Sequence, residues 1–178
     1  ASDVYKRQSN ISKIQTNFTK KQQARDQVNQ KFQEKEAELN STPHATQDEK
    51  QDALTRLTQA KETALNDINQ AQTNQNVDTA LTSGIQNIQN TQVNVRKKQE
   101  AKTTINDIVQ QHKQTIQNND DATTEEKEVA NNLVNASQQN VISKIDNATT
   151  NNQIDGIVSD GRQSINEITP DTSIKRNA

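Results

Sequence analysis

The sequence repeats itself with a constant offset of 77 residues, and this feature limits the possible folds more than any other. Ala24 aligns with Ala101, and the two copies stay in register without a gap. The matched pairs include Val28 and Ile105, Phe32 and Val109, Leu39 and Ile116, Leu57 and Val134, Ile68 and Ile145, Gly84 and Gly161, and Ile88 and Ile165. A fixed period of this kind is the signature of a repeat protein, in which each copy forms one structural unit.

The register divides the chain into two full copies with partial copies at each end. Ile88 maps back to Ile11, so the residues around Ile11 are expected to close a preceding repeat. Residues 1–8 do not fit the period and are expected to be a non-native N-terminal extension. The expected segments are 1–8 as this extension, 9–18 as the end of a preceding repeat, 19–95 as repeat 1, 96–172 as repeat 2, and 173–178 as the start of the next repeat.

The core of each repeat must be thin. Only 28% of the residues are hydrophobic, and the chain has two Phe, one Tyr and no Trp, Met or Cys. Low hydrophobicity indicates disorder when it comes with a high net charge. Here the net charge is −2, and the apolar residues are periodic. Small folded modules of modest stability are therefore expected, with disorder as the alternative.

Three amphipathic segments recur in each copy. The first is expected over about 20–39 and again over about 96–116, because apolar residues recur there every three or four positions. The third begins near Thr73 and near Thr150, and its apolar residues follow heptad spacing. With a second helix between them, these segments predict an up-down-up bundle. The fold class is thus all-α, with tandem three-helix bundles stacked end to end into an elongated rod.

The second helix opens with a capping box in both copies. Thr46 is followed three residues later by Glu49, and Thr123 by Glu126. In this motif the Thr hydroxyl accepts from the backbone N–H of the Glu, whose carboxylate accepts from the backbone N–H of the Thr. A structural role therefore accounts for these carboxylates.

A glycine recurs inside the third helix, at Gly84 and Gly161. Glycine in a helix interior costs about 1 kcal/mol relative to alanine, so its recurrence predicts that a neighbouring backbone passes close by. Pro170 is expected to stop the third helix of the second copy. Val93 stands in that place in the first copy, so the junction there is either jointed or a helix that continues toward Arg96.

No residue pattern indicates catalysis, a cofactor or a metal. His44 and His112 do not recur, and no Cys is present to complete a zinc site. Acidic pairs such as Asp48 with Glu49 are assigned to capping, and Asp120 with Asp121 to a polar turn, because neither fits a cleft or an EF-hand loop. No catalytic, cofactor-binding or metal-binding residue is therefore assigned, and the chain is not expected to be an enzyme.

Partners are restricted by the charge and the hydropathy. The balanced charge offers no basic cluster for nucleic acid, and no apolar stretch is long enough for membrane insertion. Adjacent repeats of the same chain are the expected partners, and the chain is expected to be a monomer. Phe18 and Phe32 are the only aromatic candidates for anchoring a protein ligand, and both are expected to face the core.

The shared residues resemble the tandem domain-of-unknown-function repeats of staphylococcal cell-wall-anchored surface proteins (SasC-like, FmtB-like and Ebh-like). The match is carried by Ala45-Thr46, Glu49-Lys50, Ala71, Thr73-Asn74, Asp78, Gly84 and Ile88, and by their counterparts 77 residues later. The resemblance implies a secreted, extracellular parent on a Gram-positive cell surface. Its signal peptide and sorting motif would lie outside this window, and its stalk of repeats would support attachment or biofilm formation.

The leading functional hypothesis is a structural stalk or spacer that projects an adhesive region from the cell. The alternative is a module that binds a host plasma or extracellular-matrix protein, since three-helix bundles on such surfaces also serve as binding domains. Weak self-association between rods on neighbouring cells is a third hypothesis.

Overall fold

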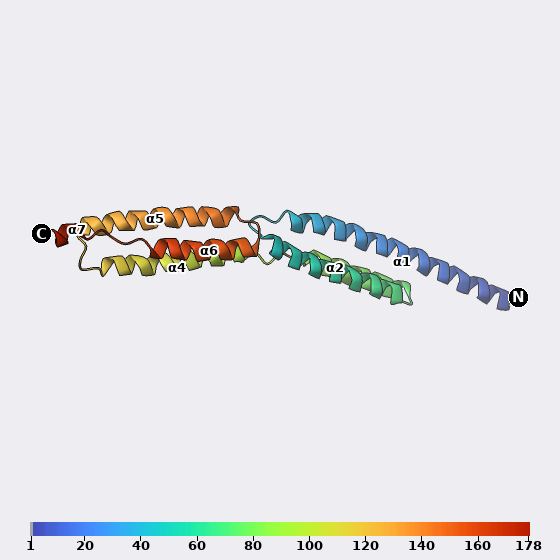
Figure 1. The fold of residues 1–178 in the computed structure, drawn as a ribbon. Helices are drawn as coiled ribbons and strands as arrows, with labels where there is room; N and C mark the ends of the chain where they lie inside the picture. Colours follow the sequence, from blue (N-terminus) through green and yellow to red (C-terminus); the bar gives the residue numbers. More distant parts are fainter. Residues whose placement is uncertain (1) are drawn as a thin grey trace. The chain divides into compact units, whose positions relative to one another are not determined.

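The computed structural model describes residues 2–178, and that range contains helices and no strand. The helices are α1 (Ser2–Asn40), α2 (Gln47–Gln70), α3 (Asn74–Gln89), α4 (Lys97–Gln117), α5 (Thr124–Asn147), α6 (Asn151–Asn166) and α7 (Ser173–Arg176). Figure 1 shows their order along the chain. The prediction of an all-α fold is confirmed.

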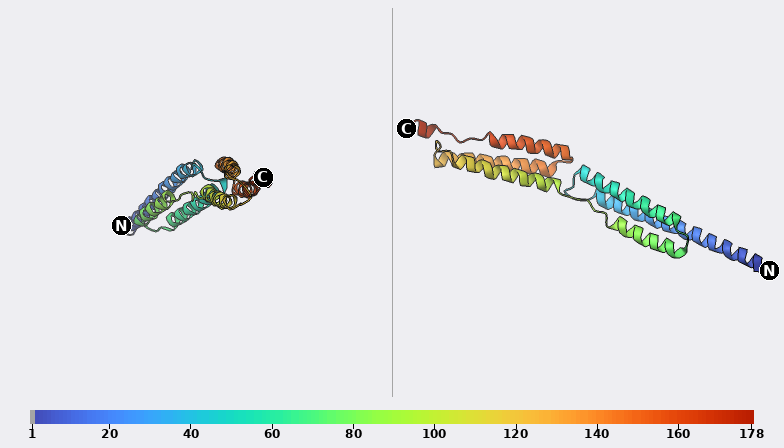
Figure 2. Two further views of the ribbon diagram at one scale, coloured as in Figure 1. Left: turned by 90° about the vertical axis from the view of Figure 1, so that its left-hand side faces the viewer. Right: turned by 90° about the horizontal axis from the view of Figure 1, so that it is seen from below.

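The chain forms two compact units, and each is described by itself. Unit 1 combines the described residues up to Pro43 with Glu49–Asn94, and unit 2 combines His44–Asp48 with Val95–Ala178. Each unit holds three long helices that lie side by side, with the first and third parallel and the second antiparallel to them (Figures 1 and 2). Within each unit, the start of the first helix and the end of the third helix therefore lie at opposite ends.

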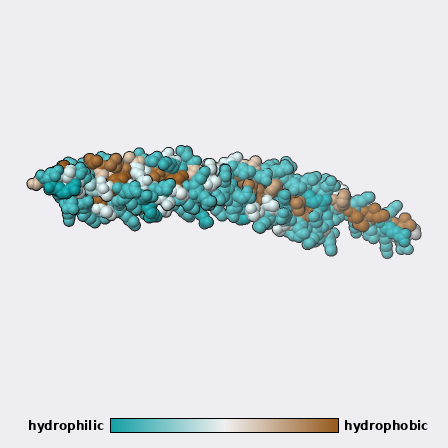
Figure 3. Space-filling model, in the orientation of Figure 1, coloured by the Kyte–Doolittle hydropathy of each residue, from teal (hydrophilic) through white to brown (hydrophobic). Residues whose placement is uncertain are grey.

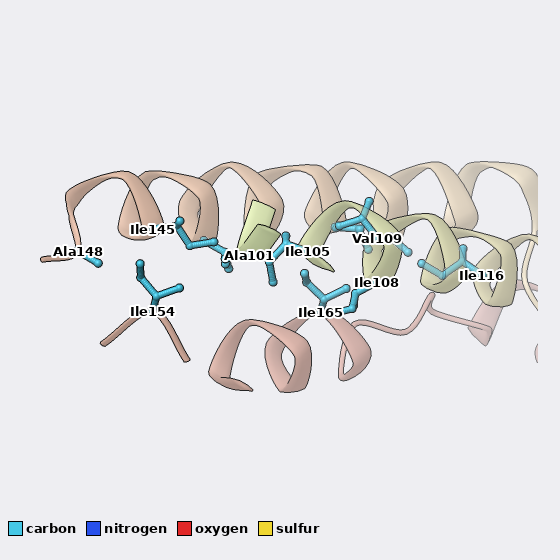
Figure 4. Close-up of a cluster of buried hydrophobic side chains, with 12 residues drawn as sticks. Ala101, Ile105, Ile108, Val109, Ile116, Ile145, Ala148, Ile154 and Ile165 are labelled. Atoms are coloured by element: carbon cyan, nitrogen blue, oxygen red, sulfur yellow. The ribbon is translucent and has the colours of Figure 1, made fainter. Parts of the chain in front are cut away.

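Each unit encloses its own aliphatic core. The buried residues in unit 1 are Ala24, Val28, Leu39, Ala53, Leu57, Ala64, Ile68, Ala71, Val77 and Ile88. Those in unit 2 are Ala101, Ile105, Ile108, Val109, Ile116, Ala130, Val134, Val141, Ile145, Ala148, Ile154 and Ile165. Figure 4 shows how Ile105 from α4, Ile145 from α5 and Ile165 from α6 converge. These cores follow the predicted stripes, since residues three and four positions apart share one helix face.

The first helix of unit 1 is longer than predicted. A start near residue 20 was expected, but α1 is one continuous helix that begins at Ser2. The segment before residue 20 contains neither Pro nor Gly, so no residue in it interrupts the helical hydrogen bonding. The second copy has no such extension, because α4 begins at Lys97 after a non-helical segment.

The junction after α3 is not helical, which rules out the alternative of a helix that continues toward Arg96 and leaves the jointed one. The backbone N–H of Asn90 donates to the Gln86 and Ile88 carbonyls, and the Thr91 hydroxyl donates to the Asn87 carbonyl at 3.0 Å. These bonds satisfy carbonyl groups of the last turn and end the helix. In the second copy, α6 ends at Asn166, four residues before the proline that was expected to stop it.

Phe18 and Phe32 differ in how far they are buried. The prediction that Phe18 faces the core is wrong, because Phe18 lies on α1 and is 63% exposed to solvent. Phe32 is half-buried and packs against the core of unit 1. The Nζ atom of Lys61 lies 4.2 Å from the centre of the Phe32 ring, a cation–π contact that covers the open side of the aromatic ring.

Candidate functional site: polar contacts between helices

Metal-ligating residue types do not cluster in the part of the chain that the structure describes. No cluster of three or more His, Asp or Glu side chains that could hold a metal ion occurs within residues 2–178. His44 lies in the turn before α2 and has a positive φ of 63°. The other histidine, His112, lies on α4, so the two side chains belong to different elements.

An open groove of about 550 Å³ lies between α5 and α6, with Lys144, Ile157 and Asp160 among its lining residues. It is a surface feature of unit 2. One carboxyl group departs from its ordinary titration: hydrogen bonds from the backbone N–H and the hydroxyl of Ser173 hold the pKa of Asp171 below its usual value. Asp171 is fully exposed beside α7, so this shift belongs to a local turn and not to a catalytic centre.

The predicted capping box of α5 is present. The Thr123 hydroxyl accepts a hydrogen bond from the Glu126 backbone N–H at 3.1 Å, and the Glu126 carboxylate accepts from the Thr123 backbone N–H at 2.9 Å. In the first copy, Thr46 and Glu49 are both buried at the start of α2. The structural assignment of Glu126 is confirmed.

A second set of caps, which sequence reasoning missed, opens the third helices. The Thr150 hydroxyl accepts from the Gln153 backbone N–H at 3.1 Å, and the Gln153 side chain accepts from the Thr150 backbone N–H at 3.2 Å. Thr73 accepts from the Asn76 backbone N–H at 3.1 Å. The spacing Thr-x-x-Gln at Thr150 is a capping-box signature that could have been recognised.

One register position holds a buried polar side chain in both copies. His112 is 8% exposed, and its Nε2 atom lies 2.5 Å from the Ile168 carbonyl oxygen, so this nitrogen donates to the carbonyl. Its counterpart Lys35 is 7% exposed, and its Nζ atom lies 3.2 Å from the Glu38 carboxylate. The burial of His112 was not predicted from the sequence. Its position four residues before Ile116 places it on the apolar face, which is the signal that was available.

The most regular polar feature joins the first helix to the other two helices, close to the start of each repeat. Lys20 on α1 pairs with Asp78 on α3 at 2.9 Å in unit 1. Lys97 on α4 pairs with Asp155 on α6 at 2.5 Å in unit 2. Each pair occupies the same register positions, 77 residues apart, so the contact between the first and third helices recurs.

The next cationic residues of the first helix reach the end of the second helix. Lys21 donates to the Asn69 carbonyl at 2.9 Å, and Arg25 donates to the Asn69 side chain at 2.8 Å. In unit 2, Lys98 donates to the Asp146 carbonyl at 2.8 Å, and Lys102 forms an ion pair with the Asp146 carboxylate. These lysines bring positive charge to carbonyl groups at the negative end of the second helix.

We call each set of three cations and their acceptors the cationic clamp. It comprises Lys20, Lys21, Arg25, Asn69 and Asp78 in unit 1, and Lys97, Lys98, Lys102, Asp146 and Asp155 in unit 2. Sequence reasoning missed it. The recurrence of Lys20-Lys21 as Lys97-Lys98 was visible in the sequence, but the partners became apparent only once the helices were placed side by side.

Exposed apolar side chains form small separate groups on a surface that is mainly polar (Figure 3). One group lies on the first part of α1 and includes Ile11, Ile14 and Phe18. A second group, on α5, consists of Val129 at 62% and Leu133 at 55% exposure. The positions that correspond to this second pair in the first copy are Asp52 and Arg56, which form an ion pair within α2.

Comparison with known sequences places both repeats in one family. The model of the Domain of Unknown Function (DUF1542) family matches residues 20–96 and 97–173. Among the described helices, none is both long and apolar enough to traverse a lipid bilayer. No solved structure matches the chain.

Curated relatives come from Staphylococcus aureus. The chain is 27% identical over 134 residues to "Extracellular matrix-binding protein EbhA" of strain Newman and to "Extracellular matrix-binding protein ebh" of strain NCTC 8325 / PS 47. The alignment covers 75% of this chain but only 4% and 1% of those relatives. The resemblance to staphylococcal tandem repeats is confirmed, and the chain belongs to the DUF1542 family, of which it carries two consecutive repeats.

Proposed function

We propose that this chain is a stalk segment of a bacterial cell-wall-anchored surface protein, which holds an adhesive region away from the cell. The observation that carries this proposal is the parallel course of the first and third helices in each unit (Figure 1). It sends the chain in at one end of a unit and out at the other, so consecutive repeats add length. A 20-residue helix spans about 30 Å, so each repeat adds roughly that distance.

The proposal includes the repeat boundaries. Repeat 1 covers 19–95, repeat 2 covers 96–172, and residues 9–18 close a preceding repeat. Ile11 supports this assignment because its two counterparts, Ile88 and Ile165, are fully buried while Ile11 itself is exposed. The register thus places an apolar residue at a core position whose covering helices would come from the preceding copy.

Small-angle X-ray scattering tests the stalk. A compact globule of this length has a radius of gyration of about 16 Å. Two units placed in line give a clearly larger value and a maximum dimension of roughly 80 Å or more. A radius near that of a globule would contradict the proposal, and a long, narrow distance distribution would support it.

A second candidate function is binding to a host plasma or extracellular-matrix protein. The relatives are named as matrix-binding proteins, and the exposed pair Val129 and Leu133 offers unit 2 an apolar contact at positions where unit 1 carries Asp52 and Arg56. Surface plasmon resonance against purified fibronectin and albumin tests this candidate. Saturable binding in the micromolar range or tighter supports it, and a flat response contradicts it.

The proposed setting is extracellular, on the surface of a Gram-positive cell, where repeats of this kind would support attachment or biofilm formation. The chain itself would act as a monomer whose nearest partners are the adjacent repeats. Sedimentation over a concentration series separates this state from weak self-association between rods, because association makes the sedimentation coefficient rise with concentration.

A further inference from the structure

We propose that the cationic clamp is the contact that carries mechanical load in each repeat. This inference rests on the proposed stalk function, because a stalk under flow or attachment is pulled along the chain. Within one unit, tension acts at the start of the first helix and beyond the end of the third. Since these helices are parallel (Figure 2), such tension slides one along the other.

The apolar contacts between these helices resist sliding weakly. Burial of aliphatic surface is non-directional, so much of it is retained while one helix begins to slide along the other. A hydrogen-bonded ion pair has a defined distance and angle, and it is lost after a short displacement. The direct pair between the first and third helices, Lys20 with Asp78, is therefore placed to oppose the first movement.

The position of the clamp along the helix strengthens this argument. In unit 2, Lys97 is the first residue of α4, the point at which tension from the N-terminal side reaches the bundle. Lys98 and Lys102 tie the same turns of α4 to Asp146 near the end of α5. The first turns of α4 are thus held by both other helices, so the contacts must break together before α4 slides.

The clamp is partly shielded from water. This shielding is on the cationic side: the side chains of Lys20, Lys97 and Lys102 are 35%, 27% and 28% exposed, whereas those of their aspartate partners are 58%, 64% and 44% exposed. Partial burial reduces screening by solvent and salt, and the lysine stems pack along the neighbouring helix. The clamp recurs with the same register in both units, whereas the ion pair of Asp52 with Arg56 has no charged counterpart in the second copy.

The test is force spectroscopy on the full chain tethered at its two ends, under constant load. Each unit gives one extension step of roughly 200 Å, since 77 residues span about 250 Å when extended and about 35 Å when folded. The variant Lys20→Met keeps the aliphatic stem and removes the charge from unit 1 only. Unit 2 remains unchanged in the same molecule and serves as an internal reference.

Lys31→Met is the matched control. Lys31 also lies on α1, its side chain is 30% exposed, and its ion pair with Glu34 stays within the one helix. We expect Lys20→Met to raise the unfolding rate of one step under load by roughly two- to fivefold, the effect of losing one partly exposed ion pair. Lys31→Met should leave both steps unchanged, and the double swap Lys20→Asp with Asp78→Lys should restore the slow step.

Equal unfolding rates under load for Lys20→Met and Lys31→Met would overturn the proposal that the clamp carries load. So would a Lys20→Met effect that appears to the same degree in chemical denaturation without load, because the residue would then contribute ordinary stability alone. Failure of the stalk itself is separate: it would appear as a compact particle in X-ray scattering of the unmodified chain, whatever the two variants do.

Discussion

A Cβ atom placed on Gly84 would lie 2.6 Å from the Cβ of Ala64, a distance that real side chains do not adopt. The Ala64 Cα would lie 3.5 Å away, so the backbone of α2 approaches α3 at this point, as the recurring glycine predicted. In the second copy, Gly161 faces the side chain of Val141, with the Cγ1 atom 2.9 Å from the position of an added Cβ. The missing side chain of this glycine thus leaves room for one residue of the second helix, which is Ala64 in the first copy and Val141 in the second.

Gly84→Ala should therefore destabilise unit 1 even though alanine favours helices. The clash involves a short side chain on a rigid helix, and overpacking of this kind costs about 1 to 3 kcal/mol. That cost exceeds or offsets the gain in helix propensity of about 1 kcal/mol. Urea denaturation followed by circular dichroism measures the change. A Gly84→Ala protein that is more stable than the parent would show that the approach of α2 is looser than the distance indicates.

Gly156→Ala is the matched control for that substitution. Gly156 lies inside α6, and no atom lies within 4 Å of an added Cβ. No steric clash then offsets the gain in helix propensity, and we expect the substitution to stabilise unit 2 by roughly 0.5 to 1 kcal/mol. The opposite signs of the two substitutions in the same assay separate helix propensity from packing.

The α5 cap gives a second prediction. Thr123→Ala removes the acceptor for the Glu126 backbone N–H and should cost about 1 kcal/mol of unfolding free energy. Thr124→Ala, one residue later on an exposed position, should change stability by less than about 0.5 kcal/mol. Thermal unfolding of the two variants compares them directly. Equal melting temperatures would mean that the capping box does not stabilise unit 2.

The sequence predicted the features that depend on local periodicity. The three helices of each copy, the cap at Thr123 and the glycine approach at Gly84 all follow from spacing within a single repeat or from comparison of the two repeats. The cores were predicted for the same reason, because aliphatic residues at three- and four-residue intervals share one face of a helix.

Features that depend on contacts between helices were not predicted. The pairing of Lys20 with Asp78 joins residues 58 positions apart, and the spacing of charges does not reveal which helices are adjacent. The burial of His112 was not predicted because a polar side chain suggests exposure, although the spacing of His112 places it on the apolar face of α4. The sequence left the end of α3 open between two alternatives, because Thr91 closes the last turn without a proline.

His112 provides a third prediction. Replacing it by alanine removes the donor to the half-buried Ile168 carbonyl, and an unsatisfied buried acceptor costs about 1 to 3 kcal/mol. His112→Lys should be milder, since Lys35 occupies the same register position in unit 1 and a lysine retains a donor. Denaturation curves of the two variants test this order. A His112→Ala protein as stable as His112→Lys would show that the hydrogen bond contributes nothing.

The exposed pair on α5 provides the last prediction. Val129→Asp with Leu133→Arg gives unit 2 the residues that unit 1 carries at Asp52 and Arg56, which pair within α2. Because both positions are exposed, the fold should be retained and stability should change by no more than about 1 kcal/mol.

If this pair contacts a host matrix protein, the double variant should lose at least about tenfold in affinity, the result of removing roughly 1.4 kcal/mol of apolar contact. Surface plasmon resonance of both proteins against the same immobilised ligand measures the difference. Unchanged affinity would assign any binding to another face, and it would leave the α5 pair as two isolated apolar side chains of the kind that most protein surfaces carry.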